Sequence, residues 1–580
     1  MRLAEVFGSI SALPSLLCLL PAFACSPSTS GTGSATGGSS NPAGGASGQL
    51  NTGGMTSASG APGTAGAASV GTAGSAYGGG GGGGGGASLA GASGAASAGD
   101  AGNGAGLGGS SSGGAPGGAG GASAGAGGVV ASGGSAACAA PTVSLSGANA
   151  VVGKLVQFND NGGWCWYQDE RAVIDTKANK LVIGSVASGG SRNGYVEAVI
   201  YDIAGGTKKL YTLGTGLASN IDDHNAPALL VRPDGKYFAM WSGHRVDCYS
   251  RTSIFDGTSW SAEKKFDWGP SGCPWAGAST NMVTYSNPWY IGSSIYAEVR
   301  SVGTDPGVLT SADDGQTLSY YGRLMSTKQV GYVAGYFKYW GNNTDRVDFV
   351  GTEAHPRDAD TSLYHGYIKG GMVYNSADAV KDTSLKDANA TSTTSVDITS
   401  YTQVFKTGST IGGVALNHAW NHDIVRYADG TIAILGQARV VGTGTDDPDK
   451  RMLYFRFDGT SWKATYLAKG GSKLYADEQD YIGLGALVPD DPTTIYISTP
   501  YDPTTDKMGS SGKHEIWRGT TCDSGATFKW TPVTANSTKD NVRPIVPKWD
   551  ATHTALLWMQ GTYTSAQSYA MAIVGTLSGQ

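Results

Sequence analysis

The stretch that decides the fold is Ser311-Ala312-Asp313-Asp314-Gly315-Gln316-Thr317-Leu318, and Thr521-Cys522-Asp523-Ser524-Gly525-Ala526-Thr527-Phe528 repeats its pattern. Both stretches place a hydroxyl residue, an aspartate, a glycine, a threonine and an apolar side chain at the same spacing. The pattern is typical of a tight turn, because aspartate accepts backbone N–H bonds and glycine tolerates a positive φ. Its recurrence predicts a fold assembled from antiparallel hairpins.

Other turns repeat as well. Residues 255–260 and 457–462 are near copies of each other, and Asp-Gly pairs stand at Asp234-Gly235 and Asp429-Gly430. Short β-branched or alternating runs lie between such turns, and each reads as a strand. The clearest are residues 181–185, 196–201, 237–241, 431–435, 494–498 and 555–558. We read residues 376–399 as a polar loop with one helical turn. The fold class predicted from this pattern is all-β.

The number of hairpins indicates which all-β fold this is. The folded part runs over about 440 residues from Thr142 to Gln580, which is long for one domain but normal for a repeat-built β fold. At about 60 residues per blade, this length predicts a seven-bladed β-propeller, with six blades and longer loops as the alternative. We therefore expect residues 142–580 to form one catalytic propeller domain.

The first 141 residues have a different composition. Residues 1–25 carry Arg2, an apolar run and a small-residue ending at Ala24, which is typical of a signal peptide. Cys25 then predicts a lipid-anchored bacterial lipoprotein, with plain secretion after cleavage at Ala24 as the alternative. Residues 26–141 are almost entirely Gly, Ala, Ser and Thr, and this predicts a disordered tether. We therefore expect a secreted or cell-surface protein that is attached to a membrane through a lipidated Cys25.

The net charge and the cysteines limit the possible partners and the cellular compartment. The formal net charge is −6 and there is no basic run, so the composition argues against a nucleic-acid partner. Five cysteines follow the signal, an odd number for an oxidising compartment. Cys248 and Cys273 are close enough in sequence to bridge a loop. We interpret the charged run Asp169-Glu170-Arg171 as a blade-closing salt-bridge cluster, or alternatively as a rim of the functional site.

The candidate site residues are proton-transfer and anion-binding groups near the ends of strand-like runs. His224 stands in Asp222-Asp223-His224-Asn225, and His244 follows in Trp241-Ser242-Gly243-His244. Tyr285 and Arg300 come after them. An imidazole exchanges protons near neutral pH, and a guanidinium binds carboxylates in bidentate fashion. This combination favours an enzyme that acts on an acidic sugar.

Three stretches together resemble a known family. They are residues 163–171, residues 222–227 together with His244, and residues 350–357. They resemble the BNR-repeat propellers that include ulvan lyases and related enzymes that cleave rhamnose–glucuronate linkages. The resemblance is best from Leu155 to Tyr374 and only general beyond.

The resemblance implies roles for individual residues. His224 and Tyr285 would be catalytic, whereas His244, Arg300 and Asn225 would bind the substrate. A lyase of this kind would cleave an acidic polysaccharide by β-elimination, and it needs no cofactor for that step. A structural zinc or calcium ion that uses His355, His422 or a spare cysteine is a separate hypothesis.

Two other functions remain as alternatives. One is a glycoside hydrolase on the same propeller, similar to a rhamnosidase or a sialidase. A sialidase needs an arginine triad, and the early Arg-Ile-Pro segment that usually supplies its first arginine is missing from the sequence. The other is a non-catalytic carbohydrate-binding propeller. In all three cases we expect a monomer.

Overall fold

The computed structural model describes residues 143–579, apart from 245, 270–282, 328–334, 388–394, 445, 477 and 479. The predicted signal peptide and tether, Cys25 and the Cys273 partner proposed for Cys248 therefore lie outside the described residues. Cys248 and Cys522 are each disulfide-bonded, and Cys165 is a buried free thiol. Within the described part of the chain, no helix is long and apolar enough to cross a membrane.

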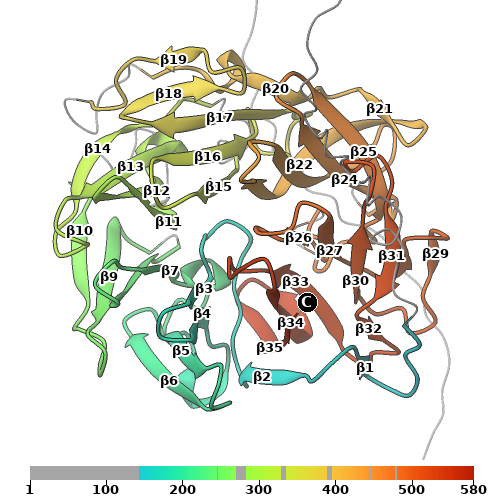
Figure 1. Ribbon diagram of the computed structural model, residues 1–580, viewed down its shortest axis with the longest axis horizontal. Coiled ribbons are helices and arrows are strands. Elements are labelled where there is room, and N and C mark those ends of the chain that lie inside the picture. The colour runs from blue at the N-terminus through green and yellow to red at the C-terminus, as the bar shows by residue number, and fades with distance from the viewer. Residues whose placement is uncertain are drawn as a thin grey trace, which may run out of the picture. The chain divides into compact units, whose positions relative to one another are not determined.

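Seven antiparallel sheets of four or more strands form the blades of a β-propeller, which confirms the predicted fold class (Figure 1). Blades 1 to 3 consist of β3 (Ala172–Asp175), β4 (Lys180–Val186), β5 (Val196–Asp202), β6 (Lys208–Gly214); β7 (Ala228–Val231), β8 (Tyr237–Ser242), β9 (Tyr249–Phe255), β10 (Lys264–Asp267); and β11 (Thr284–Ile291), β12 (Ser294–Arg300), β13 (Pro306–Ser311), β14 (Ser319–Arg323).

Blades 4 and 5 are larger. They consist of β15 (Phe337–Gly341), β16 (Arg346–Gly351), β17 (Leu363–Lys369), β18 (Met372–Asn375), β19 (Val380–Asp382), β20 (Thr402–Phe405); and β21 (Thr410–Ile411), β22 (Val414–Arg426), β23 (Ile432–Val440), β24 (Lys450–Phe457), β25 (Trp462–Lys469). In blade 4, β20 pairs with β17 beside the main strand order. The region predicted as a polar loop contains β19 and leads into the 3₁₀ turn η4 (Ile398–Ser400).

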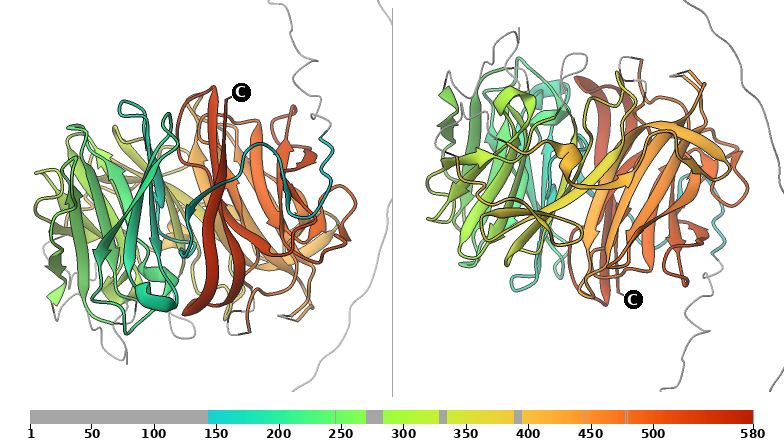
Figure 2. Two further views of the ribbon diagram at one scale, coloured as in Figure 1. Left: turned by 90° about the horizontal axis from the view of Figure 1, so that it is seen from below. Right: turned by 90° about the horizontal axis from the view of Figure 1, so that it is seen from above.

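Blades 6 and 7 complete the ring. They consist of β26 (Gly485–Leu487), β27 (Thr494–Thr499), β30 (Glu515–Thr520), β31 (Lys529–Pro532); and β33 (Asp540–Ile545), β34 (His553–Ser565), β35 (Ser568–Gly579), β2 (Val156–Asn159). Two short pairs stand apart from the blades: β1 (Ala150–Val151) with β32 (Thr534–Ala535), and β28 (Tyr501–Asp502) with β29 (Lys507–Met508). Because β2 is the outer strand of blade 7, the first part of the domain closes the ring (Figure 2).

The repeated turns lie at equivalent places. The turn at Ser311–Leu318 joins β13 to β14, and the turn at Thr521–Phe528 joins β30 to β31. In the first, Asp313 Oδ1 accepts the Thr317 N–H at 2.9 Å and Gly315 has φ +83°. Asp523 and Gly525 repeat this geometry, at 2.9 Å and +83°. The near-copies at 255–260 and 457–462 also join the last two strands of their blades, β9 to β10 and β24 to β25. These turns therefore all lie on one face of the propeller. They are structural turns and not candidate catalytic groups.

Residues 164–171, which we call the axial segment, run through the centre of the ring. Trp164, Cys165, Trp166 and Tyr167 are fully buried. The segment is hydrogen-bonded to the innermost strands of several blades: Glu170 O accepts from Leu229 N in β7 at 2.7 Å, Asp169 N donates to Asn287 Oδ1 in β11 at 2.8 Å, Lys338 Nζ in β15 donates to Trp166 O at 2.7 Å, and Arg543 in β33 donates to Trp164 O. It fills the axis and leaves the candidate site at one end.

Candidate active site

The predicted site residues leave the blades at the same face. His224 lies in the 3₁₀ turn η2 (Asp223–Asn225), between the outer strand β6 and the next inner strand β7. His244 follows β8, and Arg300 is the last residue of β12, so both lie where a second strand turns toward a third. In antiparallel blades these two kinds of connection emerge at one face. The repeated aspartate turns occupy the other face.

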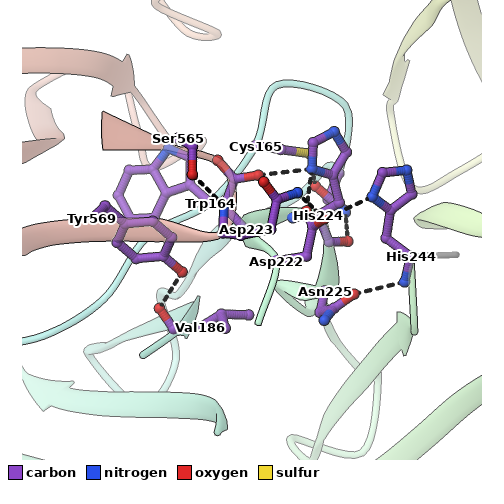
Figure 3. A network of polar contacts seen from close by, with 12 residues as sticks. Trp164, Cys165, Val186, Asp222, Asp223, His224, Asn225, His244, Ser565 and Tyr569 are labelled. Carbon is purple, nitrogen blue, oxygen red and sulfur yellow. Dashed lines mark hydrogen bonds and ion pairs between the residues drawn. The ribbon is translucent and has the colours of Figure 1, made fainter. Parts of the chain in front are cut away.

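Asp222 holds the two imidazoles together. Its Oδ1 lies 2.5 Å from His224 Nδ1, and its Oδ2 lies 2.9 Å from His244 Nδ1. The two rings stack with centroids 4.3 Å apart and an interplanar angle of 14° (Figure 3). Asp222 also caps η2, because Oδ1 accepts the His224 N–H at 3.0 Å. One carboxylate therefore fixes both rings through Nδ1.

The two histidines differ in charge because their surroundings differ. Burial lowers the pKa of His224, but Asp222 and the Asp223 carboxylate, 2.8 Å from its Nδ1, more than offset this and raise the pKa well above the usual range. Burial, together with the charge of His224, lowers the pKa of His244 to about 4, although Asp222 opposes the shift. At neutral pH the pair is thus one imidazolium and one neutral imidazole.

Tyr285 and Arg300 lie next to the imidazoles. The Tyr285 ring is 5.4 Å from the His224 ring, and the Arg300 guanidinium carbon is 4.5 Å from the Tyr285 ring centroid. Tyr285 sits in a β-bulge of β11 with φ +60°, a backbone geometry that re-aims a side chain. Asn287 supports the bulge, since its Nδ2 donates to Tyr285 O at 2.9 Å. Two further predicted groups, the Tyr285 phenol and the Arg300 guanidinium, therefore lie beside the His224–His244 pair.

Asn225 lies behind the site. It is fully buried, its Oδ1 accepts the His244 N–H at 2.7 Å, and its Nδ2 donates to Asn220 O at 3.0 Å. Its amide is thus committed to the backbone on both sides. This arrangement suits the positioning of His244 better than the substrate contact that the sequence predicted.

Sequence reasoning missed the supports of Asp223. Arg543 NH1 donates to Asp223 Oδ2 at 2.6 Å, and Tyr563 Oη donates to the same oxygen at 2.6 Å. Both residues come from blade 7, far along the chain, and both are buried. In the sequence, only Asp223 could be linked to the site, because it belongs to the Asp-Asp-His-Asn motif. No local motif pointed to Arg543 or Tyr563.

A buried aromatic cluster, which we call the aromatic floor, lies beside the histidines. It comprises Tyr285, Tyr336, Trp420 and Tyr481, which belong to one buried cluster. The Tyr336 ring lies 5.9 Å from Tyr285 and 5.3 Å from Trp420, and the Trp420 ring lies 5.9 Å from Tyr481. None of Tyr336, Trp420 and Tyr481 was predicted as a site residue. The rings are 5% exposed or less, so this floor is a packed support beneath the candidate site.

Among the described residues, Asp222, His224 and His244 form the group spaced for a metal ion. However, tetrahedral zinc with bonds of about 2.0–2.1 Å keeps neighbouring ligand atoms about 3.3 Å apart. The Asp222–imidazole distances of 2.5 and 2.9 Å are shorter and fit direct hydrogen bonds. His422, named in the structural-metal hypothesis, bonds Gln437 Oε1 through Nε2 at 3.0 Å.

No protein-family model and no curated protein matches the sequence. Solved structures do resemble the fold. An ulvan lyase of polysaccharide lyase family PL25, bound to -[GlcA(1-4)Rha3S]-, has a TM-score of 0.53 and 14% identity, and the match covers 73% of this chain and 96% of that one. A second structure, described as a PL25 ulvan lyase, has a TM-score of 0.52, 13% identity and the same coverage. At these identities the likeness establishes a shared propeller fold.

Proposed function

We propose that the protein is a polysaccharide lyase that cleaves a uronic-acid-containing glycan by β-elimination. The observation that carries this proposal is the pair of stacked imidazoles on Asp222, directly beside Tyr285 and Arg300. The fold shared with ulvan lyases adds support. An ulvan-like or rhamnose–glucuronate glycan is the substrate class that we infer.

The reaction sets three requirements. The uronate charge must be neutralised, a base must take the C5 proton, and an acid must protonate the oxygen that leaves C4. Arg300 suits the first role because its charge is permanent. Tyr285 suits the second, since its phenol can exchange a proton and its ring lies between His224 and Arg300, at 5.4 Å from the His224 ring and 4.5 Å from the guanidinium carbon. His224, held as an imidazolium, suits the third.

The electrons and protons balance in this scheme. The C5–H pair forms the C4=C5 double bond as the C4–O bond breaks. Tyr285 receives the C5 proton, and His224 gives its proton to the departing oxygen. His244 is neutral and donates through Nδ1 to Asp222, so its Nε2 remains an acceptor for a substrate hydroxyl.

The test is incubation of the purified protein with ulvan and with a plant gum capped by rhamnose–glucuronate. A lyase must release an unsaturated uronate, whose conjugation is followed by ultraviolet absorbance. We expect a rise in the wild type and a loss of about 10²- to 10⁴-fold in His224→Ala. New reducing ends without absorbance would instead identify a hydrolase, and binding without products would identify a carbohydrate-binding propeller.

A further inference from the structure

A second polar group lies across the aromatic floor from the histidines. Glu478 belongs to the connection between β25 and β26, which is an outer-to-inner connection like the one that carries His224. Arg357 belongs to the connection between β16 and β17, which is equivalent to the one that carries His244. The Tyr475 ring beside Glu478 packs 5.8 Å from Tyr481 of the floor. Glu478 and Arg357 therefore lie on the same face as His224, and the His224 charge is near enough to act on the Glu478 carboxyl.

Glu478 has one engaged and one unengaged oxygen. Its Oε2 accepts from Arg357 NH1 at 3.0 Å. Its Oε1 is buried and has no hydrogen-bond partner among the described residues. The residue is 7% exposed, compared with 6% for His224 and 6% for Arg300. A carboxylate oxygen left without a donor in such a place is costly unless a ligand supplies one.

The charged groups around Glu478 are paired with one another. Arg357 is shared between Glu478 and Asp358, whose Oδ1 accepts from Arg357 Nε at 3.0 Å. Arg439 is paired with Asp480 at 2.7 Å. Lys450 also lies near Asp480, so three cations offset three carboxylates and the like charge that a sulfate would meet is that of Glu478 itself. Burial, together with the nearby guanidinium of Arg357, keeps the pKa of His355 well below its usual range, so this imidazole adds no positive charge.

We propose that Glu478 is a specificity-determining residue, which accepts a hydrogen bond from a free hydroxyl of the sugar next to the uronate and disfavours a sulfate ester there. The inference rests on the proposed function, because it assigns the neighbouring subsite of the same site. Of the two substrate classes inferred above, this favours the unsulfated rhamnose–glucuronate glycan over an ulvan-like glycan with sulfated rhamnose.

The discrimination follows from donor and acceptor chemistry. An ionised carboxylate only accepts hydrogen bonds, so a sugar hydroxyl can satisfy Oε1. A sulfate ester offers no donor and brings a like charge into a site of low dielectric. Burial raises the pKa of Glu478 to about 7; the Arg357 and His224 charges oppose the shift, and the Asp480 and Asp358 carboxylates add to it. The carboxylate is therefore fully charged in mildly alkaline buffer, where the selection should be strongest.

The experiment measures binding separately from cleavage. Full-length His224→Ala protein, which should bind without cleaving, is titrated calorimetrically with a glucuronate–rhamnose tetrasaccharide, sulfated or unsulfated on rhamnose, at about pH 9. We expect the unsulfated form to bind about 10- to 100-fold more tightly. Adding Glu478→Gln, whose amide can donate to sulfate, should reduce this ratio to about threefold or less. Adding Glu263→Gln, which removes the same charge from a side chain that is 25% exposed next to β10 of blade 2, should leave the ratio unchanged.

Each other outcome overturns the inference. These outcomes are equal affinities, tighter binding of the sulfated form, no binding of either form, or a ratio that Glu478→Gln does not change. Wild-type cleavage is followed in parallel by ultraviolet absorbance. If the wild type produces the ultraviolet absorbance but the two tetrasaccharides bind equally well, only the role of Glu478 is refuted. If the unsulfated form binds more tightly but no absorbance appears, the lyase activity is refuted and the binding role of Glu478 remains.

Discussion

At the scale of single residues, the site depends on how Asp222 is shared. Two histidines of ordinary chemistry acquire different charges because His224 contacts two carboxylates and His244 contacts one. A shared carboxylate also stacks the rings and fixes their tautomers. Asp222 is thus a positioning residue for both imidazoles, although it need not touch the substrate.

Replacing this carboxylate tests the idea. In Asp222→Asn we expect the pKa of His224 to fall, because the amide carries no charge to stabilise the imidazolium. Elimination should fall by about tenfold or more, with a steeper loss toward alkaline pH. Imidazole NMR titration and a pH–rate profile measure the two effects. Asn225→Ala serves as a control that removes support without charge, and an unchanged His224 titration in Asp222→Asn would contradict the model.

The lowered pKa of His244 predicts a pH effect on stability. Its folded pKa is about 4, below an unfolded value of about 6.5, so the unfolded chain binds the extra proton first. Its contribution to the free energy of unfolding is therefore complete above about pH 6.5 and is lost as the pH falls toward 4. His224 acts in the opposite sense, with a raised pKa, so the comparison must isolate His244.

His244→Gln provides that comparison, since glutamine can still donate to Asp222 but gains no proton. We expect the variant to lose less stability than the wild type between about pH 6.5 and 4. Urea denaturation across this range measures the difference. Parallel curves for the two proteins would show that His244 titrates normally.

The sequence could predict part of this site only. The sequence indicated four of the candidate residues, because each has a proton-transfer or anion-binding side chain within a short local motif. These are His224, His244, Tyr285 and Arg300. Glu478 was not indicated, since its partner Arg357 stands 121 residues away and only the ring of blades brings them together. The protonation states could not be predicted either, because burial and shared partners decide them.

At the scale of elements, the strands were predictable and the axial segment was not. The runs predicted as strands became β4, β5, β8, β23, β27 and β34, since alternation and β-branching are local signals. Asp169 was expected in a blade-closing cluster or at a site rim. It does belong to a salt-bridge cluster, since it lies 3.7 Å from Arg171 and accepts from Lys338 Nζ at 2.7 Å, but this cluster is buried in the axial segment at the centre of the ring. Nothing local in the sequence indicates that a connecting segment fills a propeller axis.

The Asp169–Lys338 pair predicts an asymmetry between single and double variants. Lys338→Met leaves the Asp169 carboxylate buried without its main partner, and we expect a loss of about 3–5 kcal/mol in the free energy of unfolding. The double variant Lys338→Met/Asp169→Leu removes both charges and should recover much of that loss. Chemical denaturation of the four proteins of this cycle checks the expectation, which an additive double variant would refute.

At the scale of the whole molecule, the ring is closed by strands from the two ends of the propeller. β2 pairs with β35, and Phe158 of β2 is 1% exposed in the core between blades 7 and 1. A propeller with an unpaired final edge loses this packing and presents free backbone groups. Residues 26–141, by contrast, have the composition of a flexible tether, and we propose that they contribute nothing to the stability of the ring.

Two truncations separate these parts of the chain. The 142–580 fragment keeps β2, so we expect it to unfold at the temperature of the longer chain and to keep the same rate of elimination. The 161–580 fragment lacks β1 and β2 and should lose about 3 kcal/mol or more, because burial of Phe158 alone is worth this much. Phe158→Ala in the 142–580 fragment is the matched control. It retains strand β2 but removes the buried Phe158 side chain that packs β2 into the core. Thermal unfolding with scattering detection measures both stability and edge-driven association, and equal melting temperatures for the two fragments would show that β2 does not close the ring.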